Sequence, residues 1–131
     1  MSEPRFLKAG ITIPVGDIYG TIEWYEHVLG FEMRYIHGEG RRGENENFAN
    51  YAIMHRDEVG VSFILDEGGP VWTRSGTGYL NLNVEGVDTL HAQVQSKGVP
   101  IVRELQQENW PARGFTINDP SGNEVHIEES N

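Results

Sequence analysis

The same pattern of apolar residues occurs twice in this chain, first near the N-terminus and again about 70 residues later. Apolar side chains alternate with other residues over 11–15 (ITIPV) and over 80–84 (LNLNV). A period of two places neighbouring side chains on opposite faces of a strand, so each run predicts a strand with one buried face. Such a repeat limits the fold strongly, because both halves must form the same local structure.

Each alternating run is followed by apolar residues at the spacing of a helix. These residues are Ile18, Ile22, Tyr25 and Leu29 in the first half, and Val87, Leu90 and Val94 in the second. Asp17 and Asp88 stand where an N-cap is expected, and Gly30 and Gly98 stand where a left-handed residue would end the helix. The interval from the last valine of the strand to this glycine is 15 residues in one half and 14 in the other, which indicates an internal duplication.

Each half then contains three further strand candidates. They cover residues 31–36, 50–55 and 59–67 in the first half, and 100–105, 114–119 and 123–129 in the second. The predicted order is therefore β-α-β-β-β, twice, which is an α+β fold. We expect one domain over 1–131, with module one at about 5–68, a linker at about 69–76 and module two at about 77–131. Because a helix covers only one face of each sheet, we expect the two modules to form a curved mixed sheet around a cleft, with the helices outside.

The formal charge of the chain is −10, from 20 acidic and 10 basic residues. Nucleic acid is not an expected partner, because binding it depends on Lys and Arg at the phosphates. The acidity favours either solubility or the attraction of a cationic small molecule to an electronegative cleft. The sequence has no apolar run near 18 residues, no apolar leader and no cysteine, so we expect no membrane partner, no disulfide and a cytoplasmic location.

Strand alternation also predicts which side chains face the cleft. If the apolar positions pack against the helices, the positions between them face the open side. The side chains predicted to bind a ligand there are Thr12, Tyr79, Asn81, Asn83, His126 and Glu128. Asn is unfavourable in strands, so Asn81 and Asn83 favour a polar ligand site, although a face that is only solvated stays an open alternative.

Aromatic residues in loops could complete such a site. Trp72 and Trp110 lie in predicted loops, where an indole can stack on a planar heterocycle or cover a cation, but can also seal a dimer contact or cap the core. Phe48 stands near the end of a loop rich in Gly and Asn (37–50), which could act as a lid. The sequence contains no catalytic triad, paired-histidine motif or phosphate-binding glycine loop, so we predict no catalytic residue.

The stretch VGDIYGTIEWYEHVLGFEM (15–33), together with DPSGNEVHIEE (119–129), resembles the vicinal-oxygen-chelate superfamily over nearly the whole chain. That superfamily contains glyoxalase I, extradiol dioxygenases, fosfomycin-resistance enzymes and bleomycin-resistance proteins. The stretch RGFTINDPSGNEVHIEE (113–129), with Trp110 before it, is most similar to the bleomycin-resistance branch. This resemblance implies a homodimer that pairs modules from two chains and sequesters an antibiotic in clefts at their interface, without chemistry.

The enzymes of this superfamily hold a divalent metal, and the resemblance implies where its ligands would lie. The corresponding positions are Gly10 and Tyr79 near the first strands, and Ser62 and His126 on the last strands. Only His126 is a good ligand, so we expect no metal and no other cofactor. Glu124, His126 and Glu128 are the fallback candidates for a metal site, but these alternate residues of one strand span about 13 Å, so only two could share an ion.

We therefore expect a small-molecule binding protein of the bleomycin-resistance type, with a cationic or polar aromatic, antibiotic-like ligand. The alternative is a metal-dependent enzyme of the same superfamily, of the glyoxalase or dioxygenase type, with an atypical metal site. A third interpretation is an accessory or interaction protein whose cleft has no physiological ligand.

Overall fold

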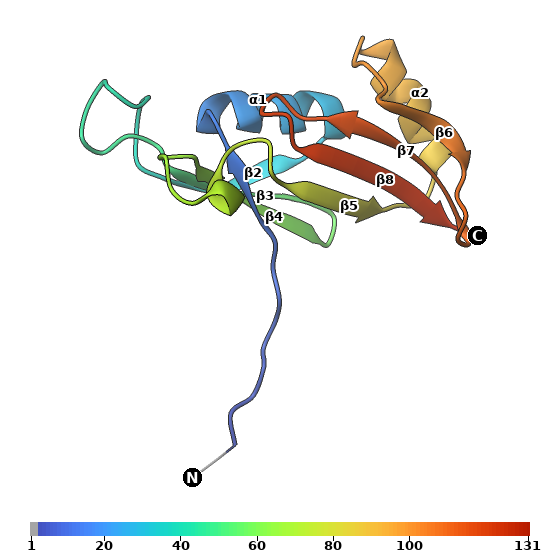
Figure 1. The fold of residues 1–131 in the computed structure, drawn as a ribbon, viewed down its shortest axis with the longest axis horizontal. Coiled ribbons are helices and arrows are strands. Elements are labelled where there is room, and N and C mark those ends of the chain that lie inside the picture. Colours follow the sequence, from blue (N-terminus) through green and yellow to red (C-terminus); the bar gives the residue numbers. More distant parts are fainter. Residues whose placement is uncertain (1–2) are drawn as a thin grey trace.

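The computed structural model describes residues 3–131, and its elements follow one order twice (Figure 1). Module one consists of β1 (Thr12–Val15), α1 (Ile18–Leu29), β2 (Glu32–His37), β3 (Tyr51–Arg56) and β4 (Val59–Leu65). Module two consists of β5 (Tyr79–Asn83), α2 (Val87–Ser96), β6 (Arg103–Gln107), β7 (Ala112–Asn118) and β8 (Glu124–Ser130). A short 3-10 helix, η1 (Val71–Thr73), lies in the connection. The predicted α+β fold of two β-α-β-β-β modules is confirmed.

The strands form two mixed sheets of four strands each, with the same order in both. Module one has the order β1-β4-β3-β2, and module two has the order β5-β8-β7-β6. The first and last strands of each module pair in parallel, and the other neighbours are antiparallel. The duplication seen in the sequence is therefore a duplication of topology. Neither helix within residues 3–131 is long and apolar enough to cross a membrane.

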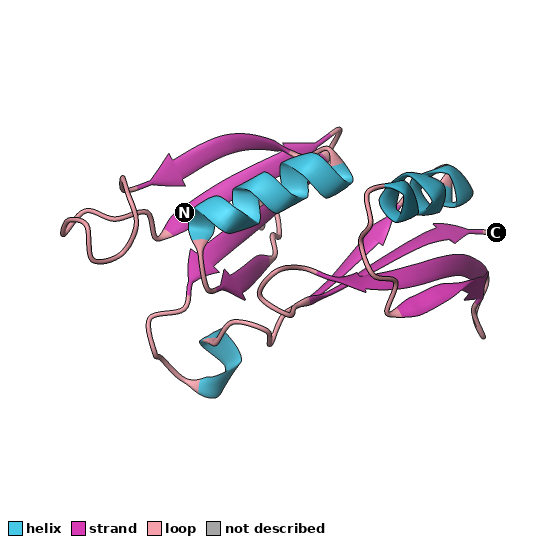
Figure 2. Ribbon diagram, turned by 90° about the horizontal axis from the view of Figure 1, so that it is seen from above, coloured by secondary structure: helices cyan, strands magenta, loops and turns pink. Residues whose placement is uncertain are grey.

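Both helices cover the same side of their sheets (Figure 2). They bury the alternate side chains predicted to face them except Ile11, which is 36% exposed. In module one, Tyr25 of α1 is fully buried against Phe63 of β4, with ring centroids 4.7 Å apart. In module two, Leu80 and Leu82 of β5 are buried, whereas the residues that alternate with them are exposed, as predicted. The helices leave the opposite face of each sheet open, which is the face expected to hold the site.

The ends of α1 are only partly as predicted. Gly30 ends the helix with φ 69°, the left-handed conformation expected of a C-cap, and its N–H bonds to carbonyls of the last turn. Asp17 has the extended backbone of an N-cap, but its carboxylate makes no capping hydrogen bond. It pairs with Arg41 of the loop after β2 instead.

The prediction that Asp88 caps α2 is wrong. Gly86 is the N-cap residue, and it has no side chain that could accept the free N–H groups of the first turn. Glu129 of β8 supplies the acceptor: its Oε1 accepts hydrogen bonds from the N–H groups of Gly86 and Val87, at 3.0 Å each. Asp88 is the second residue of the helix and pairs with Arg113.

The turn between β7 and β8 joins the two modules. Asp119 and Asn123 of this turn are buried although both are polar. The hydroxyl of Tyr25 donates to Asp119 Oδ2 at 3.0 Å, and Asn123 Nδ2 donates to the carbonyl of Pro14 at 2.9 Å. Asn123 Oδ1 accepts from the N–H of Gly78, just before β5, at 2.7 Å. Burial and the charge of Asp119 raise the pKa of Tyr25 well above its ordinary range, so its phenol stays protonated.

Candidate functional site

The open face of module two brings together five of the residues predicted to bind a ligand. Parallel pairing of β5 with β8 sets three pairs side by side, which are Tyr79 with Glu124, Asn81 with His126, and Asn83 with Glu128. Tyr79, Asn81 and Asn83 are exposed. Their role in binding stays a prediction, but strand alternation placed them correctly on one surface.

His126 and Glu128 lie on this face but are covered, with only 3% and 6% of their surfaces exposed. Gly114 of the neighbouring strand β7 makes room for them. A Cβ at this position would lie 2.9 Å from Cβ of Glu128 and 3.1 Å from Cε1 of His126. The backbone oxygen of Ile127 would lie closer still, at 2.7 Å, so any larger residue would have to shift the β8 backbone as well as the two side chains.

His126 lies between a hydroxyl and two carboxylates. Its Nδ1 is 2.9 Å from the hydroxyl of Thr116, and its Nε2 is 3.0 Å from Oε1 of Glu128 and 3.9 Å from Oε1 of Glu108. Nε2 of His126 and Oε1 of Glu128 are buried without a well-aligned hydrogen-bond partner. These two atoms lie 3.0 Å from each other and are shut off from solvent, so a ligand would reach them only after the covering side chains move.

Glu108 is the third acidic group of this face, and sequence reasoning missed it. Arg103 of β6 donates two hydrogen bonds to the carboxylate of Glu108, one of them at 2.7 Å. The hydrogen bond from Arg103 lowers the pKa of Glu108, and the same bond raises the pKa of Arg103. The sequence offers one sign of this role: Glu108 stands two positions before Trp110, at the start of a turn.

Trp110 covers these groups from the connection between β6 and β7. Its Nε1 donates to Oε2 of Glu128 at 3.2 Å, and its ring lies 6.3 Å from that of His126 at an angle of 62°. The indole is 47% exposed, so it can still meet a ligand. Partial burial, and then the charges of Glu124 and Glu128, raise the pKa of Tyr79 on the same face. We call Glu108, Trp110, His126 and Glu128 the polar cluster.

The open face of module one has a different character. Thr12, which was predicted to bind here, pairs with Ser62 across β1 and β4. The hydroxyl of Tyr51 donates to Ser62 at 2.9 Å, and the Tyr51 ring lies 6.4 Å from that of Tyr35. Tyr35 and Ile64 are exposed. Sequence reasoning missed the two tyrosines, because a bulge in β2 shifts the alternation that would have placed Tyr35 on this face.

The remaining two predicted residues do not join the polar cluster within one chain. Trp72 lies in η1 and is 77% exposed. Phe48 lies in the loop before β3, where Arg42 covers its ring at 5.7 Å. That loop projects from the end of module one that is farthest from β8 (Figure 1). The roles predicted for Trp72 in stacking and for Phe48 in a lid remain predictions.

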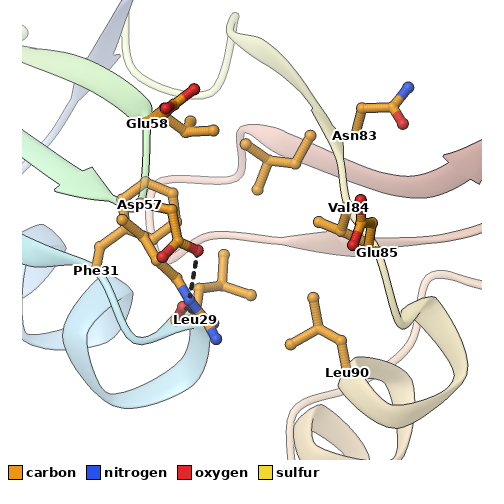
Figure 3. Close-up of a pocket in the computed structure, with 11 residues that line it drawn as sticks. Leu29, Phe31, Asp57, Glu58, Asn83, Val84, Glu85 and Leu90 are labelled. Carbon is orange, nitrogen blue, oxygen red and sulfur yellow. Dashed lines mark hydrogen bonds and ion pairs between the residues drawn. The ribbon is translucent and has the colours of Figure 1, made fainter.

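A cavity of about 700 Å³ lies between the two modules, and no residue of the polar cluster lines it (Figure 3). It is bounded by the end of α1, the β3–β4 hairpin, the end of β5 and α2, and Asn83 is the one predicted residue among those that line it. Neither this cavity nor a smaller one of about 200 Å³ near Arg41 is lined by His126 or Trp110. A hollow over the polar cluster therefore requires a further surface.

The residues at the superfamily's metal positions do not fit a metal centre. Gly10 has no side-chain donor, and Ser62 already accepts a hydrogen bond from Tyr51. Of the fallback candidates, His126 and Glu128 lie together, whereas Glu124 lies beside Tyr79 at the other end of the strand. In the part of the chain that the structure describes, no group of three His, Cys, Asp or Glu side chains is arranged to hold an ion.

Comparison with known proteins adds relatives in sequence and in fold. A bleomycin resistance protein from Geobacillus stearothermophilus is 29% identical over 126 residues, covering 85% of this chain and 87% of that protein. The structure of a glyoxalase-related enzyme from Clostridium phytofermentans has a TM-score of 0.74 at 21% identity, covering 98% of both chains. A bleomycin-binding protein complexed with bleomycin has a TM-score of 0.71 at 17% identity, covering 96% of this chain and 100% of that one. At these identities the structural likeness shows the fold.

One sequence family matches residues 9–127, which is nearly the whole chain. The matched span includes both helices, the buried turn that joins the modules, and the part of β8 that carries His126. The resemblance drawn from the sequence is confirmed. The chain belongs to the glyoxalase/bleomycin resistance protein/dioxygenase superfamily.

Proposed function

We propose that this protein binds and sequesters a cationic or polar aromatic, antibiotic-like small molecule as a homodimer, without chemistry. The observation that carries the proposal is the polar cluster, in which buried donors and acceptors lie beneath a half-exposed indole. The sequence relative named as a bleomycin resistance protein and the fold neighbour that binds bleomycin support the same class of ligand.

The face of module two offers each group that such a ligand needs. The amides of Asn81 and Asn83 can donate and accept hydrogen bonds, and the rings of Tyr79 and Trp110 can stack on a planar heterocycle or cover a cation. The carboxylate of Glu128 and the net charge of −10 favour a cationic ligand over an anionic one. Ligand sites of this kind combine apolar contact with a few polar groups that set orientation.

The dimer supplies the surface that one chain lacks. The aromatic face of module one, with Tyr35 and Tyr51, would cover the polar face of module two in a second chain. Two-fold symmetry would form the same cleft twice, once with each pairing of unlike modules. A cleft with one aromatic and one polar wall suits an aromatic ligand that carries hydrogen-bonding groups.

Fluorescence titration tests the ligand class. We expect metal-free bleomycin, or a smaller cationic heteroaromatic compound, to change the intrinsic tryptophan fluorescence with saturation. Trp110→Ala should weaken binding by at least about tenfold, because stacking and the hydrogen bond to Glu128 are both lost. Trp24→Phe is the control, since Trp24 packs against the core from α1 and lies outside the polar cluster. A folded, dimeric wild-type protein that shows no saturable signal with any such compound would contradict the proposal.

Mixing two variants tests whether the cleft is shared between chains. Trp110→Ala removes the cover of the polar face, and Tyr51→Ala removes an aromatic group of the other face. If the two walls come from different chains, a mixed dimer has one doubly altered cleft and one wild-type cleft. Isothermal titration of the mixture should then recover binding at wild-type affinity. Failure to recover it, with mixed dimers present, would place both walls in one chain.

A further inference from the structure

The cavity between the modules takes its walls from both halves of the chain. Leu29 and Phe31, at the end of α1 and just after it, come from module one, and Leu82 and Leu90 come from module two. The side chains of Leu29, Phe31 and Leu82 are buried in the core. Leu90 is half-buried, and Val59 is 39% exposed. Apolar surface therefore remains accessible to a molecule that enters the cavity.

The size of this cavity fits a small organic molecule. Its volume of about 700 Å³ is within the range of pockets that hold drug-sized ligands. In Figure 3, Leu29 lies on one side of the space, and Val84 and Leu90 lie on the other. A ligand with a bulky apolar body would therefore contact both modules at once, and removing apolar surface from water would favour its binding.

Three carboxylates line the same cavity. Asp57 and Glu58 form the turn between β3 and β4, and this turn has only two residues because Arg56 and Val59 on either side of it are paired. Glu85 follows β5 and lies across the cavity from them (Figure 3). Acidic groups therefore stand on both sides of the apolar side chains, one side in each module.

Two of these carboxylates have no cation of their own. Arg56 is the one basic residue of the lining, and its Nη1 donates to the carbonyl of Leu29 at 2.7 Å. Its Nε lies 4.0 Å from Asp57, so the charge of Arg56 is engaged within module one. Glu58 and Glu85 form no ion pair within residues 3–131. A positive charge between them would be attracted by both.

We propose that this cavity is a second ligand site, which takes a lipophilic organic cation with a bulky apolar body. The apolar body contacts Val59, Val84 and Leu90, and the positive charge faces Glu58 and Glu85. A small inorganic cation would gain less here, because it cannot cover the apolar side chains. The site is separate from the polar cluster, so its occupancy does not depend on the proposed function.

Protection of an introduced thiol tests occupancy of the cavity directly. The chain contains no cysteine, so Val59→Cys places a single thiol in the full-length protein, in the lining of the cavity. Tetraphenylphosphonium should slow alkylation of this thiol by iodoacetamide, by about tenfold at ten times its dissociation constant. Tetraphenylborate has nearly the same shape and the opposite charge, so it should not protect. Val102→Cys, at an exposed position outside the cavity, should react at the same rate with and without either ion.

Charge reversal tests the role of the two unpaired carboxylates. In the Val59→Cys background, Glu58→Lys/Glu85→Lys should raise the dissociation constant of tetraphenylphosphonium, read from the protection, by at least about tenfold at low salt. Glu46→Lys/Glu67→Lys is the matched control, because it changes the net charge equally at exposed positions outside the lining. An equal effect of the two double variants would show that only the net charge of the protein matters, and the proposal would fail.

Trp110→Ala separates this site from the polar cluster. In the Val59→Cys background it should leave protection by tetraphenylphosphonium unchanged, since Trp110 does not line the cavity. Loss of protection in this variant would show that the cation acts through the polar cluster, which would overturn the second site and leave the proposed function standing. The proposal also fails if neither ion protects the thiol, if both protect it equally, or if the thiol becomes protected on raising the protein concentration alone, which would assign the cavity to a second chain.

Discussion

Replacing Tyr25 with Phe tests whether the turn between β7 and β8 holds the two modules together. The ring of Tyr25 is fully buried against Phe63, and Phe keeps this packing while it removes only the hydroxyl. That hydroxyl donates to Asp119 at 3.0 Å, and a hydrogen bond to a charged group contributes about 1.5–3 kcal/mol. Asp119 keeps its bonds from Ser121 and Asn123, so the carboxylate is not left alone. We therefore expect a loss near the lower end, about 1.5–2 kcal/mol of unfolding free energy.

The pH dependence of this loss tests whether the Tyr25 phenol stays protonated in the folded state, which burial favours first and the charge and hydrogen bond of Asp119 favour next. The pKa of Tyr25 is raised in the folded state, so its stabilising effect is complete below the unfolded tyrosine pKa of about 10. Above that pH the unfolded chain releases a proton that the folded chain keeps, and the folded state loses stability. At pH 11 this loss reaches about 1.4 kcal/mol. A phenylalanine has no proton to lose in this range. The difference in unfolding free energy between wild type and Tyr25→Phe should therefore narrow from pH 9 to pH 11.

Urea unfolding followed by far-ultraviolet circular dichroism measures both quantities. The protein concentration must be fixed, because the proposed dimerisation would add to the apparent stability. Tyr51→Phe is the matched control: it also removes one phenol hydroxyl, but the acceptor is the neutral Ser62 and the site is only partly buried. The reasoning would be refuted if Tyr25→Phe cost no more than Tyr51→Phe and the gap stayed constant between pH 9 and pH 11.

Three further outcomes follow from the open face of module two. Gly114→Ala should lower the unfolding free energy by about 1–3 kcal/mol, measured by thermal melting, because its Cβ would lie 2.9 Å from Cβ of Glu128; an unchanged melting temperature would show that the space is not needed. Arg103→Gln should raise the pKa of Glu108 toward its ordinary value, as followed by carbon NMR. Since a lowered pKa stabilises the fold above about pH 4.5 and this effect is lost on acidification, the variant should depend less on pH in that range. Elemental analysis after purification without chelators should find no stoichiometric transition metal, and a bound ion that survives dialysis would favour the enzyme interpretation.

Strand alternation predicted the faces of the sheets because it depends only on neighbouring residues. The period of two was sufficient to place Asn81 on the open side of β5 and Leu82 on the buried side. It contains no information about what folds over that side. Glu108 and Trp110 come from the β6–β7 connection and cover His126, which lies 16 residues after Trp110 in the sequence. The burial of the predicted ligand groups was therefore not predictable from the pattern of either strand.

The errors at the helix ends have the same cause. Asp88 stands at a good local position for an N-cap, but Glu129 satisfies the first turn of α2 from more than 40 residues away. The bond from Tyr25 to Asp119 spans 94 residues. A sequence motif can mark the turn at residues 119–123 as unusual, but its role in joining the modules depends on which buried groups meet in three dimensions.

The duplication provides an internal control for the chemistry of the polar cluster. On β8, His126 and Glu128 lie beside Asn81 and Asn83, whereas the equivalent positions on β4 are Ser62 and Ile64. The same topology is therefore built in module one with a hydroxyl and an aliphatic side chain. Burying a carboxylate and an imidazole costs solvation that an apolar residue would not, and the fold does not demand them at these positions. Their presence in module two alone therefore supports the proposed binding role of His126 and Glu128.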